Sequence, residues 1–116
     1  MPLYMTQFTY TTDAWAALAN DPHHRGDVFR SLVQGLGGQL VGFYYSFGEY
    51  DGVAIYEAPD DTTAAAIVMA ALAPGHNKAI KTTKLLTVEE TLAALNKAGG
   101  VPYYSPQQYS GPPAPG

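Results

Sequence analysis

Stretches of apolar and alternating residues along this chain predict four strands. Residues 2–10 alternate loosely and are rich in Tyr, Met, Thr and Phe, which is typical of a strand. Further apolar runs predict strands over residues 39–47, 51–58 and 79–86. Runs of apolar residues that are long enough to form a strand therefore occur in both halves of the chain.

Helical spacing fills the intervals between the predicted strands. Val28, Leu32 and Leu36 are four residues apart and form one stripe, which Gly37 and Gly38 close. The other predicted helices cover residues 14–19, residues 61–73 and the segment that starts at Thr87, where Leu92 and Leu95 are expected to point inward. Thr87 and Glu90 have the spacing of a capping box.

The resulting order, β-α-β-β-α-β plus one helix, is that of a ferredoxin-like α+β sandwich with a four-stranded antiparallel sheet. Helices cover one face of such a sheet. Strand 39–47 is nevertheless apolar on both sides, with Val41, Phe43, Tyr45 and Phe47 expected on one and Leu40, Gly42 and Tyr44 on the other. We therefore expect a second subunit to pack on the helix-free face, giving a dimeric α/β barrel.

The turn at residues 48–51, Gly-Glu-Tyr-Asp, joins two of these strands. Gly48 can adopt the positive φ of a hairpin, and Asp51 can bond to nearby backbone amides. Pro59 then ends the next strand, and Asp60 or Asp61 can cap the helix that comes after it.

Composition narrows the classes of partner. The chain has 116 residues, 14% of them charged, with a formal net charge of −4 and only six Lys and Arg, so a nucleic-acid partner is not expected. No run approaches the 18 apolar residues of a membrane span, and the N-terminus lacks a charged region followed by a long apolar core, so we expect a cytoplasmic protein without membrane partners. There is no cysteine, so the sequence carries no signal of the redox compartment. Low surface charge is typical of a chain that is partly covered by copies of itself.

The chain divides by composition into residues 1–98, one domain, and residues 99–116, a tail rich in Gly, Pro and Tyr. The tail is predicted to be extended. Tyr103, Tyr104 and Tyr109 could anchor it in a groove, because tyrosine brings a large area and a polar tip at low entropy cost.

Several motifs together resemble the small bacterial GYD family over residues 2–97. They are Met1-Pro2 with Tyr4, Gly37-Gly38, Phe43-Tyr44, the Gly-x-Tyr-Asp turn, and the Glu-Ala-Pro-Asp-Asp run at residues 57–61. The resemblance implies a ferredoxin-like, dimeric α/β-barrel domain, but no activity, cofactor or catalytic residue. Relatives by fold include cofactor-free monooxygenases, haem-binding enzymes, isomerases and ligand-sensing domains, and fold does not choose among them.

Three residues are candidates for catalysis. Tyr50 and Asp51 could hold or deprotonate a ligand, although a turn aspartate more often caps the turn. Glu57 shares a side of its strand with Val53 and Ile55, where an unpaired charge is costly. It could be a base with a raised pKa, lie in water at the strand end, or pair with Lys84.

Other polar residues have simpler explanations. Lysines on the predicted edge strand, Lys84 among them, deter pairing with other chains, and ligand binding by Lys84 is the less frequent alternative. His23 and His24 with Asp27 lack the spacing of a metal site, and His76 is more often solvated than a haem ligand. No metal and no cofactor are expected.

Two functions remain open. In the first, each barrel encloses a pocket for a flat apolar or aromatic ligand, lined by Tyr4, Thr6, Tyr44 and Tyr56 with Lys84, Tyr50 and Glu57 as polar groups. Cofactor-free oxygenation or isomerisation could occur there. In the second, the protein is a non-enzymatic structural or interaction protein whose tail docks on a neighbouring subunit or another partner.

Overall fold

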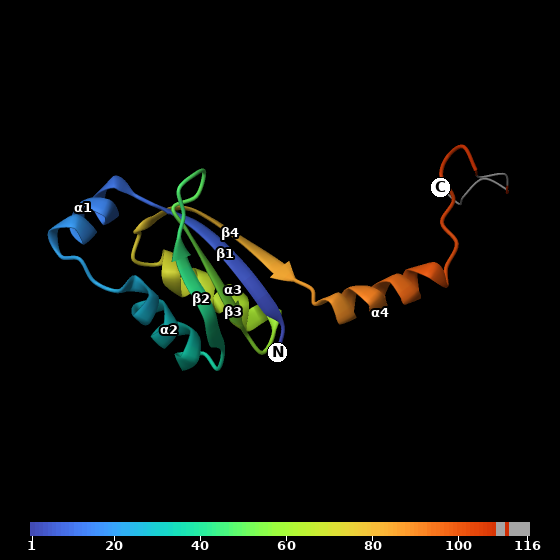
Figure 1. Cartoon of the computed structure of the whole chain (residues 1–116), viewed down its shortest axis with the longest axis horizontal. Coiled ribbons are helices and arrows are strands. Elements are labelled where there is room, and N and C mark those ends of the chain that lie inside the picture. Colours follow the sequence, from blue (N-terminus) through green and yellow to red (C-terminus); the bar gives the residue numbers. More distant parts are fainter. Residues whose placement is uncertain (109–110, 112–116) are drawn as a thin grey trace. The chain divides into compact units, whose positions relative to one another are not determined.

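A computed structural model describes residues 1–108 and 111 of the chain (Figure 1). In chain order its elements are β1 (Leu3–Tyr10), α1 (Thr12–Asn20), α2 (Arg25–Gly35), β2 (Gln39–Tyr45), β3 (Gly52–Glu57), α3 (Asp61–Leu72), β4 (Asn77–Leu85) and α4 (Val88–Gly99).

The four strands form one antiparallel sheet in the order β2-β3-β1-β4 (Figure 1). This order confirms the predicted ferredoxin-like α+β fold, with β3 inside the sheet and β4 at an edge. The first connection contains two helices, α1 and α2, because Asp21 and Pro22 separate them.

Side chains cap the four described helices at their N-termini. Thr11 caps α1, and Asp60 caps α3 by accepting a hydrogen bond from the backbone N–H of Thr63 at 2.8 Å. Thr87 and Glu90 form the predicted capping box of α4. His24, which the sequence did not suggest as a cap, begins α2. Local sequence therefore defines where these helices start.

The core lies on one face of the sheet only. Ala54 and Tyr56 of β3 are buried there against Val33 of α2 and Ile67 of α3. We call this side the helix face. The residues that alternate with them along the strand, Val53, Ile55 and Glu57, lie on the opposite, open face and are half-buried. Glu57 does share its side with Val53 and Ile55, as the alternation predicts.

A bulge in β2 changes the faces that simple alternation assigns. The register of β2 against β3 shifts between Leu40 and Gly42, so Leu40, Phe43 and Tyr45 lie on the helix face and Tyr44 lies on the open face. The predicted sharing of one side by Leu40 and Tyr44 is therefore wrong. Since β2 ends at Tyr45, Phe47 lies in the adjoining loop, fully exposed.

The loop from Ser46 to Asp51 also differs from its prediction. Gly48 has no positive φ, and within the described residues only Gly37 and Gly75 do. Six residues connect β2 to β3, which is long enough to reverse the chain without the left-handed backbone of a two-residue turn.

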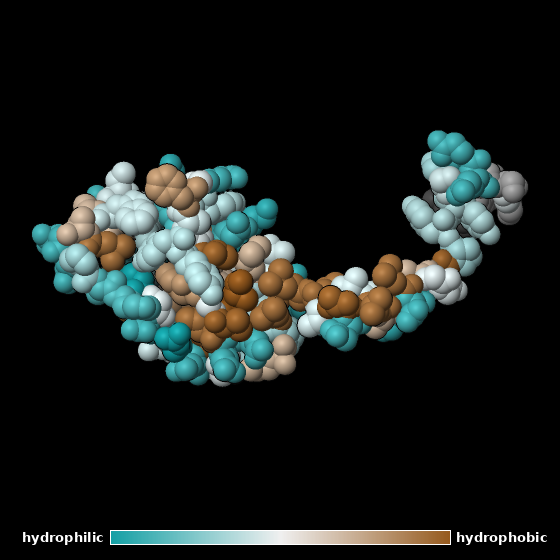
Figure 2. All heavy atoms as spheres, in the orientation of Figure 1, coloured by the Kyte–Doolittle hydropathy of each residue, from teal (hydrophilic) through white to brown (hydrophobic). Residues whose placement is uncertain are grey.

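The chain divides into two compact units, residues 1–85 and residues 86–116. The second unit contains α4, which has no buried residue. Leu92 and Leu95, which were expected to point inward, are 56% and 63% exposed. Figure 2 shows apolar side chains along this helix. The helical spacing was predicted correctly, but among the described residues of the second unit itself there is no core that receives the stripe.

None of the helices in the described residues is long and apolar enough to cross a membrane.

Candidate functional site

A cavity of ≈ 180 Å³ lies between the helix face of the sheet and the helices α2 and α3. Its apolar wall consists of Phe8, Val28, Phe29, Leu32, Phe43, Ala54, Ala70, Ala71, Pro74 and Ile80. Its polar lining consists of Thr6, Tyr10, Arg25, His76 and Asn77. The cavity is thus mainly apolar, with a few polar groups, which is typical of small-molecule sites.

Aromatic rings make up much of the wall. The ring of Phe43 on β2 lies 5.4 Å from that of Phe8 on β1 and 6.0 Å from that of Phe29 on α2, centroid to centroid. Small residues on α3, Ala70 and Ala71, also line the cavity. The cavity exists where these short side chains leave the space between sheet and helices unfilled.

Tyr10 and Arg25 bring polarity to the cavity. Burial raises the pKa of Tyr10, and so does its hydrogen bond to the Tyr45 hydroxyl at 3.4 Å, while the neighbouring Arg25 opposes the rise. Arg25 donates from Nη1 to Nε2 of His23 at 3.1 Å. His23 in turn donates from Nδ1 to the carbonyl of Asp21 at 3.0 Å, which fixes its tautomer. The guanidinium is therefore held beside a protonated phenol.

A chain of hydroxyl groups crosses the sheet next to the cavity. Thr6 is buried and its hydroxyl lies 2.8 Å from that of Tyr56 and 2.9 Å from that of Thr82. Burial raises the pKa of Tyr56, although the bonds to Thr6 and Thr82 oppose it. These hydroxyls satisfy one another, so a buried threonine and tyrosine are tolerated in the core.

A second polar group joins the start of β1 to the start of α3. The Tyr4 hydroxyl donates to Oδ1 of Asp61 at 2.5 Å, and Lys84 Nζ lies 3.0 Å from the same oxygen. The hydrogen bond to Asp61 is the main cause that raises the pKa of Tyr4 to about 12, and the same bond lowers the pKa of Asp61. Lys84 thus pairs with Asp61, and the alternative pairing with Glu57 is wrong because the two lie on opposite faces.

The residues predicted to bind a ligand do not all meet. Tyr4, Thr6, Tyr56 and Lys84 lie on the helix face, where the rings of Tyr4 and Tyr56 stack at 5.9 Å. Tyr44 lies on the open face, with its ring against Gly42. A barrel formed by open faces would therefore not place these five in one pocket. Of the five, only Thr6 lines the cavity.

The Gly-Glu-Tyr-Asp turn lies apart from the cavity. Oδ2 of Asp51 accepts a hydrogen bond from the backbone N–H of Tyr10 at 2.8 Å, and the N–H of Asp51 donates to the carbonyl of Phe8. Asp51 thus caps the end of β1, a structural role, although the role weighed from the sequence was a cap of its own turn. Tyr50 and Glu49 line an open hollow with Lys81.

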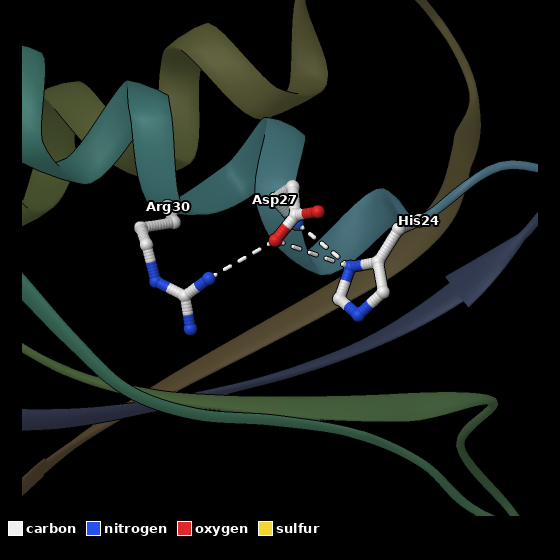
Figure 3. A network of polar contacts seen from close by, with 3 residues as sticks. All are labelled: His24, Asp27 and Arg30. Atoms are coloured by element: carbon white, nitrogen blue, oxygen red, sulfur yellow. Dashed lines mark hydrogen bonds and ion pairs between the residues drawn. The ribbon is translucent and has the colours of Figure 1, made fainter.

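The histidine pair has no metal-binding geometry. His24 Nδ1 accepts a hydrogen bond from the backbone N–H of Asp27 at 3.0 Å, and Arg30 donates to the Asp27 carboxylate at 3.0 Å (Figure 3). Within the described residues no group of three His, Cys, Asp or Glu could hold a metal ion. His24 and Asp27 instead stabilise the first turn of α2.

Of the tail tyrosines, Tyr103 is 96% exposed and Tyr104 is 57% exposed. Tyr109 lies outside the described residues.

The order of the strands and helices places the chain among the ferredoxin-like α+β proteins. Within this class the GYD domain family matches residues 4–95, and the chain belongs to this family. The resemblance inferred from the sequence motifs is confirmed.

The chain is similar to several solved structures, two of which are described. The crystal structure of MtbAldR aligns with a TM-score of 0.51 and 20% identity, over 74% of this chain and 52% of that one, so our chain spans about half the length of MtbAldR. TTHA0845 from Thermus thermophilus aligns with a TM-score of 0.48 and 14% identity, over 76% of this chain and 96% of that one. The likeness to MtbAldR shows the fold alone. No curated protein matches the chain.

Sequence reasoning missed most of the cavity. Arg25 begins a helix and Tyr10 ends a strand, so neither carries a local signal of a shared site. Phe8 and Phe43 lie in two of the predicted strands, but their local spacing gives no sign that they share a cavity wall.

Proposed function

We propose that this GYD-family protein is a homodimer that binds a small apolar or aromatic molecule in the cavity between its sheet and helices. The observation that carries the proposal is the aromatic-walled space of ≈ 180 Å³. An apolar cavity of about 150 Å³ can hold a benzene molecule, so this one suits a single ring or a compound of similar size.

The lining lacks the carboxylate base that the sequence suggested. No carboxylate is among the residues that line the cavity, and Glu57, Tyr50 and Asp51 all lie elsewhere. His76 does line the cavity, so proton transfer in oxygenase or isomerase chemistry would depend on its imidazole. Since the rest of the lining is mainly apolar, we infer a role in binding a small molecule.

Filling the cavity tests this proposal. Ala71→Leu adds three heavy atoms to the lining of the cavity, whereas Ala65→Leu adds the same atoms at an exposed position of α3. Indole, a neutral probe, should shift amide NMR signals of Phe8 and Phe43 in the native protein and in Ala65→Leu. Ala71→Leu should weaken this binding at least about tenfold. No shifts in the native protein at millimolar indole would overturn the proposal.

Exposed apolar side chains on the open face support the proposal of a homodimer. Val53 and Ile55 are only half-buried there, and Phe47 is fully exposed in the adjoining loop. Apolar surface of this kind usually marks an interface. Sedimentation of the native protein should give about twice the 12.4 kDa of one chain, and Ile55→Lys should give the monomer. Ala65→Lys, on α3, is the control that should leave the mass unchanged.

A second candidate function, docking through the second unit, is favoured by α4 and the tail. Leu92 and Leu95 are more than half exposed, and Tyr103 is almost fully exposed. A neighbouring subunit or another protein could cover them. The double variant Leu92→Gln, Leu95→Gln should then lower the oligomeric mass or partner binding, whereas Ala94→Gln, also exposed, should not.

A further inference from the structure

The cavity has an unusual charge distribution for a protein with a net charge of −4. Its lining includes one guanidinium, that of Arg25, and no carboxylate. Asn77 also lines it, but its side-chain N–H already donates to the carbonyl of Ala71 at 3.1 Å. The polar part of the cavity is therefore positive and rich in donors.

Arg25 has no carboxylate partner among the described residues, in contrast to Arg30 and Lys84. Arg30 pairs with Asp27 at 3.0 Å, and Lys84 pairs with Asp61 at 3.0 Å. Arg25 forms no ion pair with a carboxylate of the described residues, although it is half-buried. Its hydrogen bond from Nη1 to His23 leaves further N–H donors of its planar fork for a ligand.

The neighbouring Tyr10 adds a second polar group. A tyrosine hydroxyl is protonated at neutral pH, so that of Tyr10 can donate to an anion in place of its 3.4 Å contact with the Tyr45 hydroxyl. The backbone of Tyr10 is held by Asp51 at 2.8 Å, and the Arg25 guanidinium is held by His23. The guanidinium of Arg25 and the backbone of Tyr10 are thus held before any ligand arrives, which lowers the entropic cost of binding.

The geometry points to a monocarboxylate as the ligand: an aromatic or similarly compact apolar acid whose ring lies among Phe8, Phe29 and Phe43 and whose carboxylate binds Arg25. This inference rests on the proposed small-molecule function and specifies its ligand class. A guanidinium and a carboxylate match in shape and charge, and their paired hydrogen bonds are among the strongest in proteins. The volume of ≈ 180 Å³ limits the acid to about one ring.

Benzoate and benzamide separate the charge from the ring, because they have nearly the same shape and only benzoate is charged at neutral pH. Calorimetric titration of the full chain should give benzoate at least about tenfold tighter binding than benzamide. In Arg25→Gln, the affinity for benzoate should fall to that for benzamide, while the affinity for benzamide should be unchanged. Arg30→Gln removes an equal charge from the same helix outside the cavity and should change neither value.

Arg25→Lys provides a second variant in case Arg25→Gln fails to fold. It keeps the charge but loses the planar fork, so benzoate affinity should be intermediate. Equal binding of benzoate and benzamide by the native protein would overturn the carboxylate inference and leave the cavity proposal intact. An equal loss in Arg30→Gln would also overturn it, since the effect would then be general electrostatics. No binding of benzoate, benzamide or indole would overturn both.

Discussion

Ile55 and Tyr56 are neighbours in β3, yet they lie in opposite environments. Tyr56 points to the helix face, is fully buried, and bonds through its hydroxyl to Thr6. Ile55 points to the open face and remains half-exposed. One side of the sheet is thus covered by α2 and α3, and the other presents apolar side chains that no helix within residues 1–85 covers. A single chain therefore contains the cavity, whereas the proposed assembly depends on the other side.

The largest expected difference between the two faces is in the free energy of unfolding that is lost when an isoleucine is truncated to alanine. Ile67→Ala removes a fully buried side chain on the helix face and should lower the free energy of unfolding by about 2–5 kcal/mol. Ile55→Ala should cost less in the monomer because its side chain already contacts water. Urea denaturation at two protein concentrations measures both. An Ile55→Ala cost that grows with concentration would show that a second subunit covers the open face.

The next largest effect on stability is expected when two glycines near the β2–β3 loop are replaced by alanine. A Cβ on Gly52 would overlap the Phe8 ring and lie 2.9 Å from the Tyr44 carbonyl oxygen, so Gly52→Ala should destabilise the protein by about 1–3 kcal/mol. Gly48 has no atom within 4 Å of such a Cβ and no positive φ. Gly48→Ala should therefore be neutral or stabilise by about 0.5 kcal/mol. The reverse order in thermal unfolding would contradict this account of the turn.

The cap of α2 should contribute a smaller amount. His24→Ala removes the acceptor for the Asp27 N–H and should lower stability by about 1 kcal/mol (Figure 3). His24→Asn keeps a side chain that can cap the helix and should retain most of the stability. Chemical denaturation of the three proteins gives the values. Equal losses in both variants would mean that the ring contributes by packing.

The smallest effect concerns alkaline pH. Because the pKa of Tyr4 is raised from 10.0 to about 12, the folded state keeps a proton that the unfolded state releases. The resulting stabilisation is complete below pH 10 and declines as pH rises toward 12. Absorbance titration should show one tyrosine ionising near 12, and this step should be missing in Tyr4→Phe. Asp61→Asn should lower this pKa, because the carboxylate that favours the proton is gone.

The sequence was sufficient to predict the order of elements, the caps at Asp60 and Thr87 and the side of β3 on which Glu57 lies. These features depend on local spacing, with a period of two in strands and of about 3.6 in helices. The bulge in β2 could not be predicted in this way. A single extra residue near Val41 reverses the face of the remaining strand residues, so alternation placed Leu40 and Tyr44 together although the sheet separates them.

Contacts between distant residues were also out of reach of local pattern. Tyr4 meets Asp61 across 57 positions, and Arg25 reaches a cavity whose other walls come from β1, β2, α3 and β4. Each of these residues has an ordinary local environment in the sequence. Only the packing of α2 and α3 on the sheet brings them together, so of the residues predicted to bind a ligand Thr6 alone lines the cavity.

The hydrogen bond from the Tyr10 N–H to Asp51 has a consequence for comparing members of the family. Asp51 belongs to the signature turn and Tyr10 to the cavity lining, so the motif holds the backbone of a lining residue that lies outside the motif. Exchanging turns between two homologues should therefore change the shape of the cavity, even with every lining side chain kept. A motif that identifies relatives can thus influence a cavity that its own side chains do not line.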